Sequence, residues 1–503
     1  MHVLLLDPQY WFDFTALGHT VSAVPLTEYE TPLEHILATL PAPPDCIIQQ
    51  EQLGVRHFVT GLEHAPCPTL YLAFDAHLNL YWQQYYAGLF DAVLTPHRTL
   101  FEALPPENRH PQTFRLVPAG TDLPWVDHAD RQHPLAFCGR ITSARPLRKA
   151  MTGLLQNRFG LAVHRDMPPE AMFRFYQDAR IIPNEAICFE VNMRLLEGAS
   201  AGAALLTPDC GPDQLAAFTD GAEMLVYRDG LDLCEKASWL LRNPDKAETM
   251  GRTAWERVQR EHLPIHRAAF VLGILPGLTQ TRVTGRDAAV LTWLTRLERT
   301  QSGDLQYPAS GLLSASAALP DTPEVLAGML RLLGSPARKT PALEFCRLLL
   351  NSGTASLLRN ATASACALTH GDLPLAQAFH ARQFPPSPIP LSPAALCRAW
   401  ATALHENGRT VRPGFAFRPE AGHLPACALE FLAFAKHLCP QERETLALEE
   451  AALLKPFPAY ASYRLSLLKS LPPSGQNLDE LADLLLFCCR VDEGLALREK
   501  IVR

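Results

Sequence analysis

The chain has 503 residues, of which 48% are hydrophobic and only 19% are charged, and its formal net charge is −7. A chain of this length exceeds what one hydrophobic core supports, so we expect about three well-packed globular domains. The negative charge and the lack of a long basic run give no indication of a nucleic-acid partner.

Thirteen cysteines are scattered through the sequence without a CxxC motif, which favours neither a disulfide framework nor a zinc site. We expect most of them to be small buried hydrophobic residues in a reducing compartment. The apolar N-terminal run is too short for a signal peptide, and the longest later apolar stretch, 268–278, is about half a bilayer span. These features predict a soluble, cytoplasmic protein without a transmembrane segment.

The first part of the chain, residues 1–125, alternates short apolar runs with helix-like stretches. The runs are rich in Val, Ile and Leu and bounded by Pro, Gly or Asp, which is typical of buried parallel strands. The expected strands are 2–6, 20–24, 46–50, 69–74, 92–95 and 115–117. Their regular spacing predicts a Rossmann-like lobe with crossover helices on both faces of the sheet.

A second alternating block, residues 131–283, follows a short polar linker. Its expected strands are 135–138, 161–164, 180–183, 203–207 and 224–227. This block predicts a second Rossmann-like lobe.

The remaining residues, 286–503, show amphipathic helical patterns and no convincing strand. The clearest helical stretches are 288–300, 323–333, 341–350, 373–383, 394–406 and 477–491. The segment 370–379 resembles the start of a tetratricopeptide-type repeat, although no period of 34 residues recurs. We expect an all-α domain, either a degenerate helical repeat or an irregular helical domain, in which the proline-rich stretch 385–390 forms a stiff connector.

Polar residues cluster where a strand and a helix of the second block meet. The helix expected after strand 180–183 begins near Asn192 and Arg194, carries Glu197 and ends near Gly202. Its N-terminus lies at the carboxyl edge of a parallel sheet, where open α/β folds bind ligands. A carboxylate there can accept two hydrogen bonds from a ribose diol, while an arginine and free backbone N–H groups suit a phosphate.

The same segment resembles the C-terminal lobe of GT-B glycosyltransferases, and most closely the CgeB-like group related to glycosyl transferase group 1. That group has an Asn-x-Arg-x-(Phe/Leu)-Glu-x-x-Ala-x-Gly pattern, on or beside which Asn192, Arg194, Glu197 and Gly202 fall. The resemblance implies that Glu197 holds the ribose of a sugar nucleotide and that the others belong to the same donor site.

Further matches extend the resemblance to residues 135–275. Gly139 and Arg140 resemble the Gly-Arg turn that opens the second lobe and approaches the diphosphate, and the stretch 218–227 resembles the family's Gly-x-Glu hairpin. The match is weak over 1–125 and absent over 286–503. Phe189 stands where many retaining members carry a first glutamate, so the resemblance leaves the stereochemistry open.

Each donor-site residue also has a structural interpretation. Glu197 and Arg194 are three residues apart on one helix and would form a surface ion pair. Asn192 would cap the helix, Gly202 would end it, and Arg140 would be a solvated loop residue. For Glu197 and Arg140 we favour ligand binding.

Two residues of the first block, Asp75 and His77, follow the expected strand 69–74. At the carboxyl edge of that sheet they would act as a base or bind an acceptor hydroxyl. The alternative is an aspartate that caps a helix beside a solvated histidine. No Asp-x-Asp dyad occurs in the sequence, so we expect no metal site and metal-independent chemistry, with Arg140 and helix dipoles at the diphosphate.

Together these features predict an enzyme that transfers a sugar from a nucleotide-sugar donor, which is a co-substrate rather than a bound cofactor, to a hydroxyl of a glycan or protein. The helical domain would recruit that acceptor or a protein partner. Two alternatives stay open: a sugar-nucleotide epimerase of related fold, and a non-catalytic scaffold that binds the sugar nucleotide.

Overall fold

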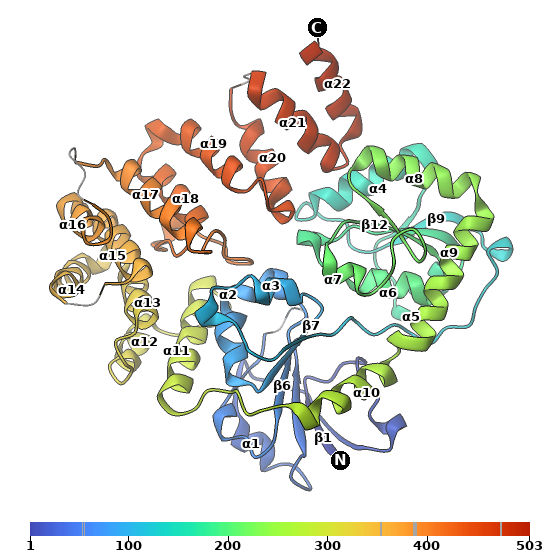
Figure 1. Cartoon of the computed structure of the whole chain (residues 1–503), viewed down its shortest axis with the longest axis horizontal. Helices are drawn as coiled ribbons and strands as arrows, with labels where there is room; N and C mark the ends of the chain where they lie inside the picture. Colours follow the sequence, from blue (N-terminus) through green and yellow to red (C-terminus); the bar gives the residue numbers. More distant parts are fainter. Residues whose placement is uncertain (53, 55, 353–354, 386–389, 473–474, 503) are drawn as a thin grey trace. The chain divides into compact units, whose positions relative to one another are not determined.

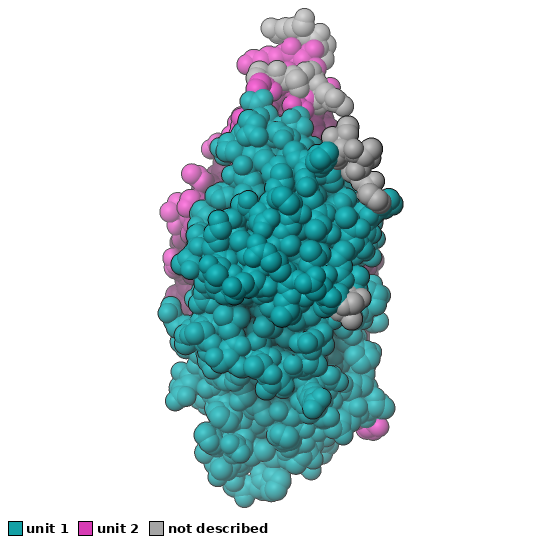
Figure 2. Space-filling model, turned by 90° about the vertical axis from the view of Figure 1, so that its left-hand side faces the viewer, with its two compact units in different colours: residues 1–8, 20–114, 277–453 teal, residues 9–19, 115–276, 454–503 magenta. Residues whose placement is uncertain are grey.

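The structure is a computed structural model that describes residues 1–52, 54, 56–352, 355–385, 390–472 and 475–502. Residues 386–389 of the expected proline-rich connector lie outside this range. The chain forms two compact units, each assembled from separate segments (Figure 2). The first unit contains residues 1–8, 20–114 and 277–453, and the second contains 9–19, 115–276 and 454–503.

The first unit is built around a six-stranded sheet with the strand order β2-β1-β4-β6-β7-β8. Its strands are β1 (His2–Leu6), β2 (Thr20–Val24), β4 (Cys46–Gln50), β6 (Thr69–Leu72), β7 (Ala92–Thr95) and β8 (Thr113–Arg115). The pairings of β1 with β2 and β4, of β4 with β6 and of β6 with β7 are all parallel. The apolar runs therefore form a buried parallel sheet, as their composition predicts.

Three details of this sheet differ from the expected strands. A separate parallel pair, β3 (Glu30–Pro32) and β5 (Phe58–Thr60), was not expected, and β8 begins two residues before the expected 115–117. Strand β6 ends at Leu72 instead of residue 74. The amide of Phe74 donates to the buried carboxylate of Glu51, not to a neighbouring strand.

The second unit contains a five-stranded parallel sheet with the order β10-β9-β11-β12-β13. These strands are β9 (His133–Cys138), β10 (Ala162–His164), β11 (Ala179–Pro183), β12 (Ala204–Pro208) and β13 (Leu225–Tyr227). All five coincide with expected strands to within two residues at either end. Helices α4 and α8 cover one face of this sheet, and α5 and α6 cover the other (Figure 1).

Helices make up most of the rest of the described chain. Those of the first unit are α1 (Leu33–Leu37), α2 (Ala76–Tyr86), α3 (Arg98–Glu102), α11 (Gly285–Ser302), α12 (Ala309–Ser316), α13 (Pro323–Leu333), α14 (Lys339–Asn351), α15 (Leu357–Thr369), α16 (Leu373–Gln383), α17 (Pro393–Glu406), α18 (Ala428–Leu438) and α19 (Arg443–Leu453). Those of the second unit are α4 (Pro146–Phe159), α5 (Pro169–Gln177), α6 (Met193–Ser200), α7 (Pro212–Leu215), α8 (Gly230–Arg242), α9 (Pro244–Arg257), α10 (Pro264–Ile274), α20 (Ala461–Lys469), α21 (Gly475–Phe487) and α22 (Val491–Val502).

The helical region is shared between the two units. Helix α11 packs on α2, and Ala288 belongs to the core of the first sheet. Successive helices then pair along the chain, α15 with α16 and α17 with α18 (Figure 1). The segment 454–503 instead belongs to the second unit, so the expected domain 286–503 is divided at residue 453.

One expected helix is wrong in extent. The stretch 477–491 is not a single helix, because α21 ends at Phe487 and α22 begins at Val491. Cys489 between them has φ +57°, a left-handed conformation that ends a right-handed helix.

Two Rossmann-like lobes and a large helical region confirm the predicted fold class, an α/β protein with an added all-α part. Across the part of the chain that the structure describes, no helix has both the length and the apolar character needed to span a bilayer. All thirteen cysteines are free.

Candidate functional site

The candidate site lies at the carboxyl edge of the second sheet. Strands β9, β11 and β12 end there at Cys138, Pro183 and Pro208. The helices that follow β9 and β11, α4 and α6, begin at this edge because their strands are parallel. The edge therefore brings together the Gly139–Arg140 turn and the N-terminal half of α6, as the sequence predicts.

The side chain of Arg194 supports the Gly139–Arg140 turn through the carbonyl of Cys138, the residue before the turn. Its guanidinium donates to the carbonyl of Cys138 from both Nε and Nη2, at 3.3 and 3.0 Å, and lies over the ring of Phe137. Gly139 has φ +150°, and a Cβ atom at this position would come within 2.5 Å of Nη2 of Arg194. Only glycine fits at position 139 without displacing Arg194. The group that comes close to this glycine is therefore the Arg194 guanidinium.

Asn192 stands at the N-cap of α6, but its side chain does not bond to the first turn of the helix. Its Nδ2 donates instead to Oδ1 of Asn184 at 3.1 Å and to the carbonyl of Glu185 at 3.0 Å. Asn184 also accepts a bond from Nη1 of Arg194 at 3.3 Å. The expected capping bond is therefore wrong, and Asn192 ties the loop after β11 to the start of α6.

Asn184 and Glu185 belong to this site although the sequence argument overlooked them. Both are buried, and Glu185 accepts a hydrogen bond from Nε of Arg148 at 2.7 Å. The sequence could have indicated both residues, because they are the first two polar residues after the expected strand 180–183.

Glu197 is half-buried on the second turn of α6. No hydrogen bond or ion pair joins its carboxylate to any residue that the structure describes. Burial raises the pKa of Glu197, and the positive charge of Arg194 opposes that rise in pKa only in part. The expected salt bridge with Arg194 is absent among the described residues, so the carboxylate keeps its hydrogen-bonding capacity for a ligand.

Positive charge gathers around the turn that follows β9. Arg140 is exposed, and its carbonyl accepts a bond from Nη1 of Arg148. Burial, with the charges of Arg194 and Arg145 nearby, lowers the pKa of Arg148 to about 10, despite its carboxylate partner Glu185. Such mutual repulsion among cations is relieved by an anion, so this edge of the sheet favours a phosphate-bearing ligand.

The N-termini of α4 and α6 at this edge lack side-chain caps within the described structure, as do those of α5 and α7. Helix α8 of the same sheet provides the contrast, because Asp229 accepts bonds from the amides of Leu231 and Asp232. The free first-turn amides of α4 and α6 are groups that bind phosphate oxygens well.

Gly202 is not brought together with these residues. It follows the C-terminal end of α6, about 12 Å along the helix from its start. Its φ is +72°, and a Cβ atom there would come within 2.7 Å of the Trp125 ring. This position agrees with the helix-ending interpretation of Gly202, and its contact with a ligand stays a prediction.

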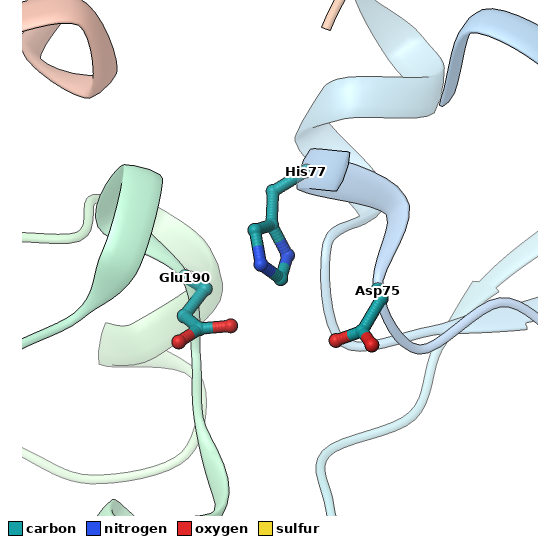
Figure 3. A group of neighbouring side chains, drawn as sticks. All are labelled: Asp75, His77 and Glu190. Atoms are coloured by element: carbon teal, nitrogen blue, oxygen red, sulfur yellow. The ribbon is translucent and has the colours of Figure 1, made fainter. Parts of the chain in front are cut away.

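In the first unit, Asp75 and His77 lie at the start of α2, at the carboxyl edge of the first sheet (Figure 3). Glu190, also shown in Figure 3, is a residue of the second unit, in the loop before α6. Asp75 occupies the N-cap position without a side-chain cap bond. The amides of Phe74 and Asp75 donate to Glu51, at 2.7 and 2.8 Å, so the Glu51 carboxylate holds the backbone that leads into α2.

His77 is buried, not solvated, and its ring meets that of His97 edge to face with centroids 5.3 Å apart. His97 follows β7 as His77 follows β6, so both come from the same edge of the sheet. Sequence reasoning overlooked His97 and Glu51, although each stands within two residues of the end of an expected strand.

Comparison with known proteins finds a family match over the second sheet. Residues 123–273, which contain the whole second sheet and the helices around it, match the family model described as Glycosyl transferase-like. This part of the chain is similar to that family, and the enzyme class that the resemblance implied, glycosyltransferase, is confirmed. No curated protein matches the chain.

Several solved structures are similar to this chain at low sequence identity. HepE of Anabaena in complex with UDP-glucose is 11% identical, covers 55% of this chain and 100% of its own, and superposes with a TM-score of 0.36. The sucrose-phosphate synthase of Thermosynechococcus elongatus is 13% identical over 55% of this chain and 98% of its own, with a TM-score of 0.36. A glycosyltransferase of Rickettsia africae is 11% identical over 55% and 98%, with a TM-score of 0.39.

Proposed function

We propose that the chain transfers a sugar from a nucleotide-sugar donor to a hydroxyl acceptor, and that the donor binds at the carboxyl edge of the second sheet. The Glu197 carboxylate carries this proposal. It is half-buried beside cationic side chains and has no bonded partner among the described residues. Burying a carboxylate without a partner costs free energy, and a ribose diol bound there would repay that cost with two hydrogen bonds.

The groups around Glu197 suit the rest of a nucleoside diphosphate. The uncapped first turns of α4 and α6 offer amide donors, and Arg140 is an exposed guanidinium next to them. During transfer the bond between the sugar and the diphosphate breaks, and negative charge grows on the leaving oxygen. Cations and helix N-termini placed at that oxygen stabilise the transition state more than the ground state.

On the acceptor side we propose Asp75 or His77 as the group that takes the proton from the attacking hydroxyl. Both lie at the carboxyl edge of the first sheet, where a parallel α/β lobe binds ligands. The reaction as proposed needs no metal ion, because the cations and helix dipoles of the second lobe neutralise the diphosphate.

The finer assignments also belong to this proposal. We assign the chain to the CgeB-like group on the Asn192-to-Gly202 pattern, and we place the protein in the cytoplasm. The helices between residues 285 and 453 would present a glycan or protein acceptor, since paired helices form extended binding surfaces.

Incubation of the purified protein with UDP-, GDP-, ADP- and TDP-sugars tests this function. Release of the matching nucleoside diphosphate, lost in Glu197→Ala and unaffected by EDTA, is the expected result. The matched control is Glu256→Ala, which removes an exposed glutamate of the same unit. An isomerised donor sugar would indicate an epimerase, and binding without turnover would indicate a scaffold.

A further inference from the structure

The loop that leads into the donor site contains a strained turn. Cys188 and Phe189, in the 3-10 turn Ile187–Phe189, have φ values of +51° and +60°. Two consecutive residues other than glycine in the left-handed region each cost about 1–2 kcal/mol. This conformation persists only where surrounding contacts hold it, and it lies three residues before Asn192, the N-cap of α6.

The C-terminal segment of the chain supplies those contacts. The ring of Phe487, at the end of α21, stacks on the ring of Phe189 with centroids 5.5 Å apart and planes inclined by 22°. The turn Pro458–Tyr460 packs on the turn Ile187–Phe189 as well. All of these residues belong to the second unit.

The α21–α22 hairpin is itself firmly seated in the second unit. Leu486, Cys489 and Val491 belong to the same hydrophobic core as strands β9, β11 and β12. Gly230, the first residue of α8, lies so close to the hairpin that a Cβ atom there would come within 2.9 Å of the Cα of Cys489. The hairpin is therefore a fixed support for whatever it contacts.

A small pocket of about 20 Å³ lies where the hairpin meets the loop. Phe487 and Cys489 line it from the hairpin, and Glu185, Ala186 and Phe189 line it from the loop that follows β11. The hairpin and the donor-site loop thus line the same pocket, and removal of the Phe487 ring would leave space beside the turn for it to relax.

We propose that the C-terminal hairpin positions the donor site: Phe487 holds the Cys188–Phe189 turn in its left-handed conformation and thereby fixes Asn192 and the start of α6. This inference rests on the proposed function, because it assigns Phe487 as a positioning residue for the same donor site. Phe487 acts through Phe189 and need not touch the donor.

Substitution of Phe487 by leucine or alanine in the full chain tests the proposal. Both variants should weaken binding of the donor nucleotide by about tenfold, which corresponds to the strain of one such residue, with the larger effect for alanine. Phe487→Tyr keeps the ring and should bind as the wild type does. Leu495→Ala on α22 is the matched control, since Leu495 is 39% exposed.

A second substitution separates positioning from general destabilisation. Glycine adopts the left-handed conformation without the cost that cysteine bears, so Cys188→Gly in the Phe487→Leu background should restore most of the lost affinity. A merely structural role of Phe487 predicts no such rescue. Wild-type affinity in Phe487→Leu, or a loss that Cys188→Gly leaves unchanged, would overturn the proposal.

Amide hydrogen exchange gives a readout that does not depend on any nucleotide. Residues 187–193 should exchange faster in Phe487→Leu and return toward wild-type rates when Cys188→Gly is added. If the wild type binds no sugar nucleotide, the proposed function fails while this exchange pattern still decides whether Phe487 positions the loop. Unchanged exchange in Phe487→Leu would reject the positioning role by itself.

Discussion

At the scale of single residues, the two charged side chains of α6 differ in their contacts. Arg194 is buried and donates to Cys138, Tyr176 and Asn184, so its guanidinium supports the turn after β9. Glu197 is half-buried and has no such bond to the described residues. A residue that costs stability without a compensating contact is typical of a functional site.

We predict that Glu197→Gln stabilises the ligand-free protein at pH 7. Because burial raises the folded-state pKa of Glu197 above its usual value of 4.5, ionised Glu197 lowers the free energy of unfolding above that raised pKa. This penalty is absent below the unfolded-state pKa, where the carboxyl is protonated in both states. The amide stays neutral throughout, so the gain should be about 1 kcal/mol at pH 7 and should vanish toward pH 4.

Thermal unfolding of both proteins between pH 4 and 8 checks this, with Glu256→Gln as the control. A Glu197→Gln protein that is less stable than the wild type at pH 7 would mean that the carboxylate has a stabilising partner.

The sequence was sufficient to single out Glu197 and the Gly139–Arg140 turn, because strand ends and motif spacing place them at one edge of the sheet. It was not sufficient to assign Arg194, whose partners come from β9 and from the loop after β11. Which of two neighbouring charges faces a ligand depends on side-chain packing that a one-dimensional pattern does not contain.

At the scale of secondary-structure elements, the apolar runs rich in Val, Ile and Leu predicted their strands well, since strands buried on both faces require such residues. The missed strands β3 and β5 have three residues each and a mixed composition, as in Glu30–Pro32. Beyond strand β6, the amides of Phe74 and Asp75 donate to Glu51. Tertiary contacts of this kind set the boundaries that local sequence patterns leave open.

A buried ion network joins three helices of the first unit. Glu298 on α11 accepts bonds of 2.6 and 2.9 Å from Arg331 on α13, and it lies 3.4 Å from Arg412. Arg412 also pairs with Glu430 on α18 at 3.0 Å. The two arginines lower the pKa of Glu298 despite its complete burial.

We predict that Glu298→Ala destabilises the first unit by about 3–5 kcal/mol, because it leaves Arg331 as a buried charge without its carboxylate partner. Since the folded-state pKa of Glu298 is lowered, its contribution is present above the unfolded-state value and is lost as the pH falls through the folded-state pKa. Urea unfolding at pH 7 measures the loss.

The control is Glu344→Ala on α14, which removes an exposed glutamate and should cost less than about 0.5 kcal/mol. Equal stabilities of the two variants would show that the network contributes little to the fold.

At the scale of the whole molecule, each unit is assembled from segments that are distant in the sequence. The change of pattern near residue 286 suggested a simple boundary between the second lobe and a helical domain. That change of pattern marks the end of the strand-containing blocks. It does not mark the end of the second unit, because Leu486, Cys489 and Val491 belong to the core of the second sheet. Helical periodicity shows that a helix has an apolar face but not which core receives it.

We predict that a chain ending at residue 453 loses stability in its second unit, because removal of the hairpin exposes the part of the core that α8 shares with it. The double variant Leu486→Ala/Val491→Ala tests the same contacts in the full chain and should cost at least about 2–5 kcal/mol, the range for one buried leucine. Calorimetry of both proteins provides the measurement. Transitions unchanged from wild type would contradict the assignment of residues 454–503 to the second unit.

Isothermal titration of a sugar nucleotide into the wild type, Glu197→Ala and Glu256→Ala tests the central claim most directly. Loss of two hydrogen bonds to a charged group should weaken binding by about 3 kcal/mol, roughly a hundredfold, in Glu197→Ala alone. Equal affinities in all three proteins would mean that the nucleotide does not bind at the carboxyl edge of the second sheet.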